Sequence, residues 1–334
     1  MQKTLVITAL VAAAITLAAA ALLLAFRAVS GSEDPAVAPC RRPHTTLSRS
    51  HVVLDHRELG VRFTCNGAQL AGTLFLPLSR GPHPSVVWLH GSGQTPRLTY
   101  GPLVTSYVND GIAFFSYDKR GVGQSEGDCC PDETGHFNLV TADAVGAVAA
   151  LRSSPEIDPR QIGYLGASAA GWIAPRAAEQ SRAAFVAIVS PGVLRHSLVA
   201  KYEQYTGGSE SNEPRPSEAE IARKIAGWER SGFDPQPYLE RLTIPALWLF
   251  GGADRNVPSI HSAALLRSIK HDRAKDWTIV VYPGAGHGLF DSPPTDPRAT
   301  PAAEAWIRRH VHLPPVTLTP NARPRTRPSL AASA

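Results

Sequence analysis

The sequence predicts an α/β fold: a mostly parallel twisted sheet with helices on both faces, an N-terminal β-hairpin and an inserted helical cap. Three observations predict it. Six short apolar runs alternate with longer, mostly helix-length segments, which is typical of β–α–β units. A hairpin pattern precedes these runs, and one interval between them is too long for a single crossover. The chain has 334 residues, 43% hydrophobic and 18% charged, enough for one large or two small domains and too apolar for a disordered chain.

The strands and helices are predicted from local patterns. Two segments, Leu59–Thr64 and Leu70–Leu76, alternate in polarity around an Asn66–Gly67 pair, which is a strong hairpin signal. The segment Phe137–Arg152 carries apolar residues at the spacing of a helix face. The apolar runs, which we expect to form the parallel strands, are Ser85–Leu89, Ile112–Tyr117, Gln161–Leu165, Phe185–Val189, Ala246–Phe250 and Trp277–Tyr282.

The long interval between the fourth and fifth runs predicts the cap, over about residues 192–243. Within it, the segment Ser217–Ser231 has a helical pattern, and Ser217 precedes Glu220 by three residues as in a capping box. The predicted organisation is therefore an anchor or signal over 1–30, a linker over 31–50, an α/β body over 51–312 that contains the cap, and a disordered tail over 313–334 that is rich in proline and arginine.

The N-terminal segment predicts export. Thr4–Phe26 is an uncharged apolar run of 23 residues, about 34 Å long as a helix and enough to cross a bilayer. We expect an uncleaved membrane anchor, with a cleaved signal peptide as the alternative because Ala28–Ser30 resembles a cleavage site. Both interpretations place the body outside the cytoplasm, membrane-anchored in the first and secreted or periplasmic in the second.

The charge and the cysteines limit the function. The net charge is +5, but residues 40–50 and 313–334 hold three arginines each, so the body is near neutral and no nucleic-acid partner is expected. The four cysteines are Cys40, Cys65, Cys129 and Cys130. They suit an exported chain; Cys40–Cys65 is one possible disulfide, and free thiols are the alternative. No Cys-x-x-Cys motif supports zinc or thioredoxin chemistry.

Ser168 is the predicted nucleophile. It lies where a strand that ends at Leu165 meets a helix, and small residues flank it at 166, 167, 169, 170 and 171. A serine on a sharp strand-to-helix turn needs small neighbours, because bulk would collide with the strand or the helix. The alternative is an ordinary helix N-cap serine. Ala170 stands where a second glycine is usual, which leaves less room at the turn and puts the rate in doubt.

Asp254 and His287 are the predicted partners of Ser168. Each lies on a glycine-rich loop that follows an apolar run, so the ends of parallel strands should bring both to one edge of the sheet. A serine hydroxyl needs a base to take its proton, and the imidazole needs an acid to orient it. Asp291 and Asp296 are alternative acids, but both follow His287 and break the order serine, acid, histidine.

The turn at residues 90–93 (HGSG) follows the first apolar run. We expect backbone N–H groups of this turn, together with that of Ala169, to face a developing oxyanion, and His90 to brace the turn. Asp118 and Arg120 are interpreted as an ion pair that holds a loop, rather than as catalytic groups.

Five motifs together resemble an α/β-hydrolase of the bacterial esterase and serine-peptidase-like superfamily, either dienelactone-hydrolase-like or similar to the S9 or S33 serine peptidases. They are the 90–93 turn, residues 117–127 (YDKRGVGQSEG), the 166–171 elbow, the Gly-Gly-Ala-Asp loop that ends at 254 and the Gly-His-Gly loop around 287. The resemblance covers about residues 57–312. It implies Ser168 as nucleophile, His287 as base and Asp254 as acid, with Ser92 and Ala169 as the oxyanion hole.

The predicted function is hydrolysis of a small-molecule carboxylic ester through an acyl-enzyme, with no metal and no cofactor. An amidase, peptidase or thioesterase on the same fold is the nearest alternative, and a catalytically silent interaction module is a second. The sequence leaves the acyl specificity and the oligomeric state open.

Overall fold

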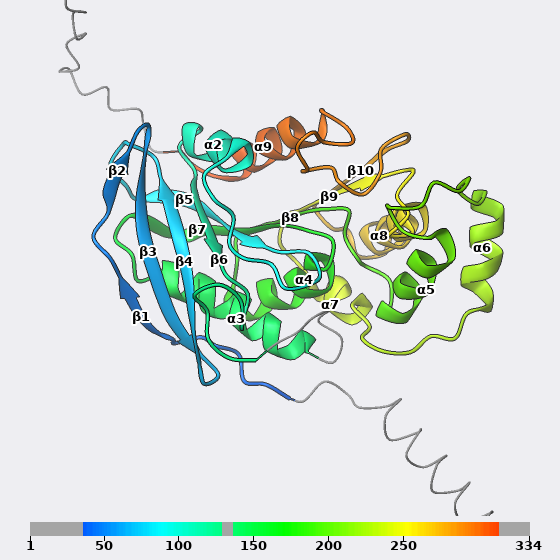
Figure 1. Ribbon diagram of the computed structural model, residues 1–334, viewed down its shortest axis with the longest axis horizontal. Coiled ribbons are helices and arrows are strands. Elements are labelled where there is room, and N and C mark those ends of the chain that lie inside the picture. The colour runs from blue at the N-terminus through cyan, green and yellow to red at the C-terminus, as the bar shows by residue number, and fades with distance from the viewer. Residues whose placement is uncertain (1–35, 129–135, 314–334) are drawn as a thin grey trace, which may run out of the picture.

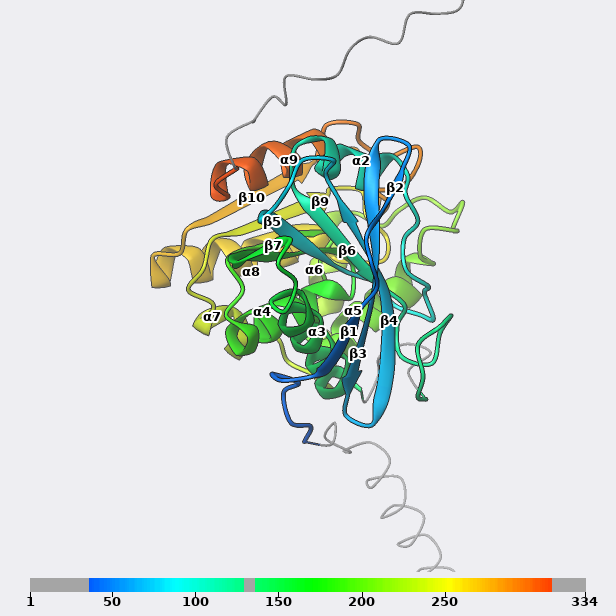
Figure 2. The same cartoon turned by 90° about the vertical axis from the view of Figure 1, so that its left-hand side faces the viewer.

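The computed structural model describes residues 36–128 and 136–313. Its centre is a ten-stranded sheet in the order β1-β3-β4-β6-β5-β7-β8-β9-β10, with β2 paired to the outer side of β3. The strand direction turns progressively across this open sheet (Figure 2). The strands are β1 (His44–Leu47), β2 (His51–Val53), β3 (His56–Cys65), β4 (Ala68–Leu76), β5 (His83–Leu89), β6 (Ala113–Tyr117), β7 (Ile157–Ala167), β8 (Val186–Val189), β9 (Ala246–Gly251) and β10 (Trp277–Tyr282).

The parallel part of the sheet confirms the prediction from apolar runs. Strands β5 to β10 pair in parallel, and each corresponds to one of the six runs, although β6 and β8 begin one residue after the predicted start. The central strands β5, β6, β8 and β9 are buried along their whole length, which is why they read as continuous apolar stretches. Strands β1 to β4 add antiparallel pairs at one edge.

The predicted hairpin is the β3–β4 pair. Cys65 pairs with Ala68, and both residues of the two-residue turn between them have positive φ, 44° at Asn66 and 79° at Gly67. Asparagine and glycine tolerate this geometry best, so the turn chemistry selects the hairpin. The segment 31–50, predicted as a linker, instead contributes β1, which pairs antiparallel with β3 from His44 to Leu47. The reason is that the outer edge of β3 offers backbone groups that an extended chain can pair with.

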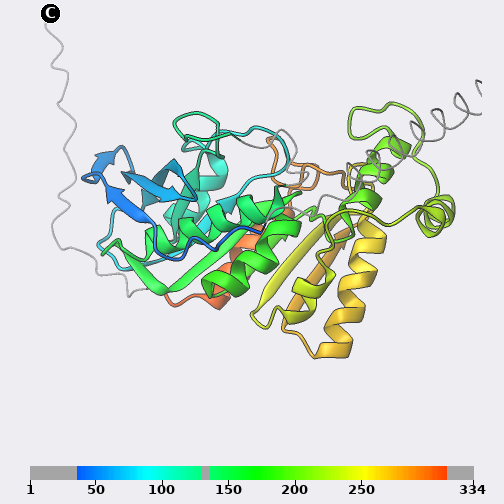
Figure 3. The ribbon, with the colours of Figure 1, turned by 90° about the horizontal axis from the view of Figure 1, so that it is seen from below.

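Helices cover both faces of the sheet, as predicted (Figure 1). One face carries α3, α4, α7 and α8, whose apolar sides join the larger core cluster; they are green to yellow in Figure 3. The other face carries α2 and α9, which pack in a second cluster. The helices are α2 (Pro102–Asn109), α3 (Phe137–Leu151), α4 (Ala170–Ser181), α5 (His196–Thr206), α6 (Glu218–Gly227), α7 (Gln236–Arg241), α8 (Ser259–Arg273) and α9 (Ala299–His310).

The helical insertion lies between β8 and β9. Its helices α5 and α6 form a small cluster of their own around Tyr202, Ile221 and Ile225, at one end of the molecule (Figure 1). Helix α6 begins with the predicted capping box, in which Ser217 and Glu220 satisfy each other's backbone N–H groups. Helix α7 differs, because Leu239 is fully buried in the main core.

Two predictions fall wholly or partly outside the described residues. Thr4–Phe26 lies outside them; in residues 36–128 and 136–313, no helix is both long and apolar enough to cross a bilayer. Of the cysteines, Cys129 and Cys130 also lie outside. Cys40 and Cys65 are free thiols that contact each other through a hydrogen bond. This hydrogen bond, followed by burial, raises the pKa of the Cys65 thiol.

A buried ion pair joins the loop after β6 to helix α3. Arg120 donates to Asp143 at 2.5 and 3.0 Å, and the side chains are only 4% and 3% exposed. Replacing Asp143 with alanine should lower the free energy of unfolding by about 3–5 kcal/mol, because the guanidinium stays buried without its counter-ion. Denaturant unfolding measures this. The control is Glu179→Ala, which breaks the exposed pair with Arg241 and should cost less than about 1 kcal/mol; equal costs would contradict the prediction.

Candidate active site

Ser168 lies on the sharp turn between β7 and α4. Its φ is +55°, a left-handed conformation that costs a non-glycine residue about 1–3 kcal/mol and is common at functional sites. Backbone hydrogen bonds hold this conformation: the Ser168 N–H donates to the Val189 carbonyl at 3.0 Å, and its carbonyl accepts from Gly171 and Gly192 at 2.9 and 3.0 Å. The side chain is half-buried at the carboxyl edge of the sheet.

The small residues around Ser168 are required by close approach. A Cβ at Gly166 would lie 2.6 Å from the Leu89 carbonyl oxygen and 2.7 Å from the Ala170 Cβ. A Cβ at Gly171 would lie 2.7 Å from the Gly192 carbonyl oxygen. Ala170 is fully buried at this turn. Its methyl group occupies the space beside Gly166, so the turn accommodates alanine at 170 because position 166 has no side chain.

Asp254 and His287 are joined directly. The Nδ1 atom of His287 lies 2.8 Å from the Oδ2 atom of Asp254. Asp254 is fully buried, and its Oδ1 atom accepts from the backbone N–H groups of Asn256 and Val257 at 2.8 and 2.9 Å. These two bonds leave Oδ2 for the imidazole, so the carboxylate orients the ring with Nε2 free of the acid.

The loops that carry this pair touch each other closely. A Cβ at Gly251 would lie 2.1 Å from the Gly286 carbonyl oxygen, and the Ala253 N–H donates to the Ala285 carbonyl at 2.8 Å. A glycine at 251 is therefore needed to bring the loops after β9 and β10 together. Ser190, after β8, fixes the second loop, since its hydroxyl donates to the His287 carbonyl at 2.6 Å.

The environment of His287 raises the pKa of its imidazole. Burial favours the neutral ring and lowers the pKa, but the hydrogen bond and the charge of Asp254 outweigh it, with smaller contributions from Glu203 and Asp291. Among the described contacts, Asp291 makes no hydrogen bond to His287, and the other alternative acid, Asp296, pairs with Arg298 at 2.6 Å. Of the three predicted acids, the structure joins only Asp254 to His287 by a hydrogen bond.

The 90–93 turn lies against the serine. A Cβ at Gly91 would be 3.4 Å from the Ser168 Cβ and 4.0 Å from its Oγ. Within the described residues, the backbone N–H groups of Ser92 and Ala169 donate no hydrogen bond, which leaves both available. His90 braces the turn as predicted: its Nδ1 accepts from Trp88 at 3.1 Å and its Nε2 donates to the Tyr117 carbonyl at 2.8 Å.

Burial lowers the pKa of His90 to about 4, although the hydrogen bond to the Tyr117 carbonyl acts in the opposite direction, so the His90 ring is neutral. A neutral ring with Nε2–H is the form that both hydrogen bonds require.

The structure brings the predicted residues to one edge without linking them all. In the described part of the chain, the Ser168 hydroxyl makes no hydrogen bond to His287; the two are connected through the backbone of the loop after β8. Such contacts are often long in unliganded enzymes.

The expected Asp118–Arg120 pair is wrong. Asp118 pairs with Arg97 at 2.6 Å, and Arg120 pairs with Asp143. Each pairs instead with a residue that packing brings close from another segment, since Arg97 lies between β5 and α2 and Asp143 lies on α3.

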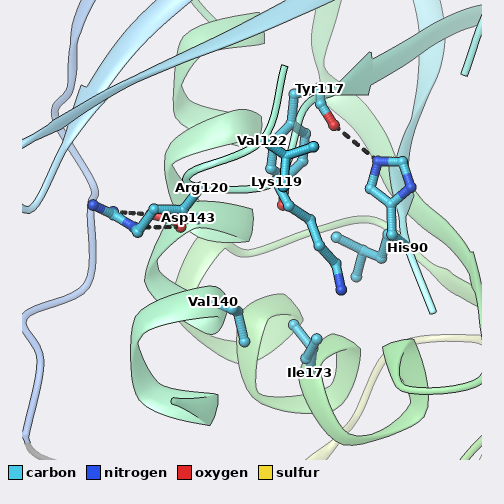
Figure 4. A pocket seen from close by; sticks show the side chains of 9 residues that line it. His90, Tyr117, Lys119, Arg120, Val122, Val140, Asp143 and Ile173 are labelled. Carbon is cyan, nitrogen blue, oxygen red and sulfur yellow. Dashed lines mark hydrogen bonds and ion pairs between the residues drawn. The ribbon is translucent and has the colours of Figure 1, made fainter. Parts of the chain in front are cut away.

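Two residues of the site were missed at the sequence level. They are Ser190 and Lys119, both polar residues just after a buried strand. That position was the available signal, because the carboxyl ends of parallel strands share one edge of the sheet. A pocket at this edge lies behind the 90–93 turn and is lined by Lys119, His90, Val140 and Ile173 among others (Figure 4). Ser168 and His287 do not line it.

Comparison with curated proteins finds esterase relatives. Esterase EstD of Thermotoga maritima is 28% identical over 221 residues, which cover 58% of this chain and 52% of that protein, so the chain spans about half of its length. An uncharacterized protein of Mycobacterium tuberculosis is 28% identical over 246 residues, covering 72% of this chain and 75% of that protein.

Solved structures share the fold. Acetyl xylan esterase 1 from Thermoanaerobacterium is similar with a TM-score of 0.57 at 20% identity, covering 79% of this chain and 88% of that one. An esterase from Pyrococcus furiosus has a TM-score of 0.57 at 18% identity, covering 82% and 97%. At these identities the likeness shows the α/β-hydrolase fold.

The model of the prolyl oligopeptidase family matches residues 131–313, more than half of the chain. This protein therefore has the α/β-hydrolase fold and belongs to the prolyl oligopeptidase family.

Proposed function

We propose that the protein is a serine hydrolase that cleaves a carboxylic ester through an acyl-enzyme. The observation that carries the proposal is the 2.8 Å hydrogen bond between His287 and the fully buried Asp254, at the sheet edge where Ser168 is held with a positive φ. A histidine oriented by a buried acid is the base that a serine nucleophile needs. The esterase relatives support the choice of an ester over other acyl substrates.

The reaction follows from the groups present. The Ser168 hydroxyl attacks the ester carbonyl while its proton passes to Nε2 of His287, and the negative charge of Asp254 stabilises the imidazolium that forms. The carbonyl oxygen becomes an oxyanion, which the N–H groups of Ser92 and Ala169 bind. His287 returns the proton to the leaving alcohol. Water then attacks the acyl-enzyme by the same route and releases the acid.

Covalent labelling tests the nucleophile. A fluorophosphonate probe should label the protein once, and peptide mass mapping should place the label on Ser168; the Ser168→Ala variant should take up no label. Labelling at another serine, or undiminished labelling of the variant, would refute the proposal. Ser190 is the informative internal control, since its hydroxyl already donates to the His287 carbonyl and should stay unmodified.

A peptidase or amidase is the second candidate, and the family match favours it. A rate panel separates the two. It compares p-nitrophenyl esters of rising chain length with a thioester of matched acyl group and with an aminoacyl-proline p-nitroanilide. If the protein is an esterase, kcat/KM for the best ester should exceed kcat/KM for the anilide by orders of magnitude. A faster anilide would replace the esterase proposal with a peptidase.

The rate should depend on pH through His287. Only the neutral ring accepts the Ser168 proton, so kcat/KM should rise with pH through the His287 pKa, which lies above its ordinary value of 6.5. The acid limb should therefore have its midpoint above pH 6.5. Glu203→Gln should move the midpoint down and leave the plateau unchanged, because the Glu203 charge raises this pKa. A midpoint below 6.5 in the unmodified protein would contradict the assignment.

The same raised pKa affects stability in the opposite sense. Protonated His287 is favoured in the folded state, so its contribution to stability is complete below the ordinary pKa and is lost as the pH rises through the raised value. As the pH rises through the His287 pKa, kcat/KM should therefore increase while the contribution of His287 to the free energy of unfolding decreases.

A further inference from the structure

Lys119 binds the carbonyl groups of Gly91 and Gly93, the residues before and after Ser92. Its Nζ atom donates to the Gly91 carbonyl at 2.6 Å and to the Gly93 carbonyl at 2.8 Å. Lys119 follows β6, whereas the 90–93 turn follows β5, so the contact links the ends of two adjacent parallel strands. Figure 4 shows the Lys119 side chain reaching across the pocket behind the turn.

These bonds determine where the Ser92 N–H points. The peptide unit is planar and trans, so the carbonyl of Gly91 and the N–H of Ser92, which share one peptide, point in opposite directions. With the Gly91 carbonyl held by the ammonium, the Ser92 N–H must face away from Lys119. On the serine side, Gly91 approaches Ser168 so closely that a Cβ would be 3.4 Å from the serine Cβ. Lys119 therefore pulls the carbonyls to one side of the turn and presents an N–H to the other.

Because glycines flank Ser92, the orientation of its N–H group has to be fixed by a contact such as that of Lys119. Gly93 has a φ of +87°, and glycine on both sides of Ser92 leaves the two peptide planes free to rotate. A flipped Gly91–Ser92 peptide would aim a carbonyl oxygen, instead of an N–H, at the developing oxyanion. A charge-assisted bond is roughly twice as strong as a neutral one, so the bond to the Gly91 carbonyl favours the productive orientation of the Gly91–Ser92 peptide. The bond to the Gly93 carbonyl holds the peptide that follows Gly93 and so fixes the far side of the turn.

We propose that Lys119 is a positioning residue that orients the Ser92 N–H toward the oxyanion of the tetrahedral intermediate. The proposal rests on the proposed ester hydrolysis at Ser168. Lys119 acts through the turn and does not contact the substrate. Removing one oxyanion donor typically lowers kcat by about 10²–10³-fold, and misorienting a donor that is still present should cost less, about 10–100-fold.

The experiment compares Lys119→Met with Lys119→Arg. The methionine variant keeps the apolar stem without a donor and should lower kcat for a p-nitrophenyl ester by about 10–100-fold while KM changes less than about threefold. Rates are expressed per active site, titrated with the fluorophosphonate, so that unfolded protein does not count. The arginine variant, which keeps the charge and several donors, should recover most of the loss. If the methionine variant does not fold, Lys119→Gln takes its place with the same expectation.

A second readout separates orientation from general damage. An aryl trifluoromethyl ketone adds reversibly to Ser168: its carbonyl carbon bonds to Oγ, the hydroxyl proton passes to His287, and an oxyanion remains. Its affinity should fall by the same factor as kcat in Lys119→Met, whereas substrate binding should not.

Lys275 is the matched control, because its ammonium also donates to two backbone carbonyls, of Glu240 and Leu242, at 2.6 and 2.8 Å far from the site. Lys275→Met should leave both kcat and ketone affinity unchanged. Unchanged kcat and ketone affinity in Lys119→Met would overturn the inference, as would an equal loss in Lys275→Met. Neither result touches the proposed function, which the labelling and activity of Ser168→Ala test separately.

Discussion

Replacing Ser168 with alanine should lower kcat for a p-nitrophenyl ester by about 10⁶-fold, because the variant has no nucleophile to form the acyl-enzyme. The His287–Asp254 hydrogen bond does not involve Ser168, so the rest of the site should persist. The backbone bonds from Val189, Gly171 and Gly192 also remain, since they use the main chain of residue 168. Alanine should therefore abolish the chemistry without unfolding the turn.

Steady-state rates and thermal unfolding together check this prediction. The Tm of Ser168→Ala should lie within a few degrees of that of the unmodified protein. The variant's residual reaction should show no initial burst of p-nitrophenol. Ser268→Ala, which removes an exposed hydroxyl on α8, is the matched control and should retain the full rate. A Ser168→Ala protein that keeps more than about a hundredth of the activity would mean that another group attacks the ester.

The second large effect is expected for Asp254→Asn, a fall in kcat of about 10⁴-fold. The asparagine amide can donate a hydrogen bond to Nδ1 of His287 and so favours the tautomer that carries its proton on Nε2. That tautomer cannot accept the serine proton. The imidazolium also loses the charge that stabilises it. Oδ1 still has its two backbone donors, Asn256 and Val257, which keeps the loop in place.

The pH profile identifies the cause. In Asp254→Asn the acid limb should move to lower pH, because the bond and charge that raise the His287 pKa are gone. Asp291→Asn removes a charge that also raises this pKa, but Asp291 is not bonded to the ring. The acid limb of this variant should therefore move to lower pH, while its kcat should stay within a few-fold of that of the unmodified protein. If Asp291→Asn were the more damaging of the two, the acid would be misassigned.

Much of the fold follows from local patterns. The six parallel strands are visible as apolar runs because strands covered by helices on both faces need apolar side chains on both sides. The Asn66–Gly67 turn is visible because its positive φ angles select those two residue types. The capping box of α6 is visible because its bonds join residues three apart. The periodicity of residues 137–152 corresponds in the same way to α3.

The contacts that were not predicted join distant parts of the chain. β1 pairs with β3 because the edge of that strand is open, a property of the assembled sheet rather than of residues 44–47. Arg120 pairs with Asp143 on α3, and Asp118 with Arg97, although Asp118 and Arg120 are only two positions apart in the sequence. Charge partners depend on which elements pack together, which residue spacing does not reveal.

The amino-acid sequence thus identifies the groups of the proposed site. A serine among small residues, and an acid and a histidine on glycine-rich loops, are all recognisable from neighbours along the chain. Only the tertiary structure decides how these groups are held. It shows the glycines at 166, 171 and 251 to be close-approach positions, Ser190 to anchor the histidine loop, and Lys119 to bind the 90–93 turn. The physical reason is that such contacts arise where separate strands end at the same edge of the sheet, and the order of strands in the sheet differs from their order in the chain.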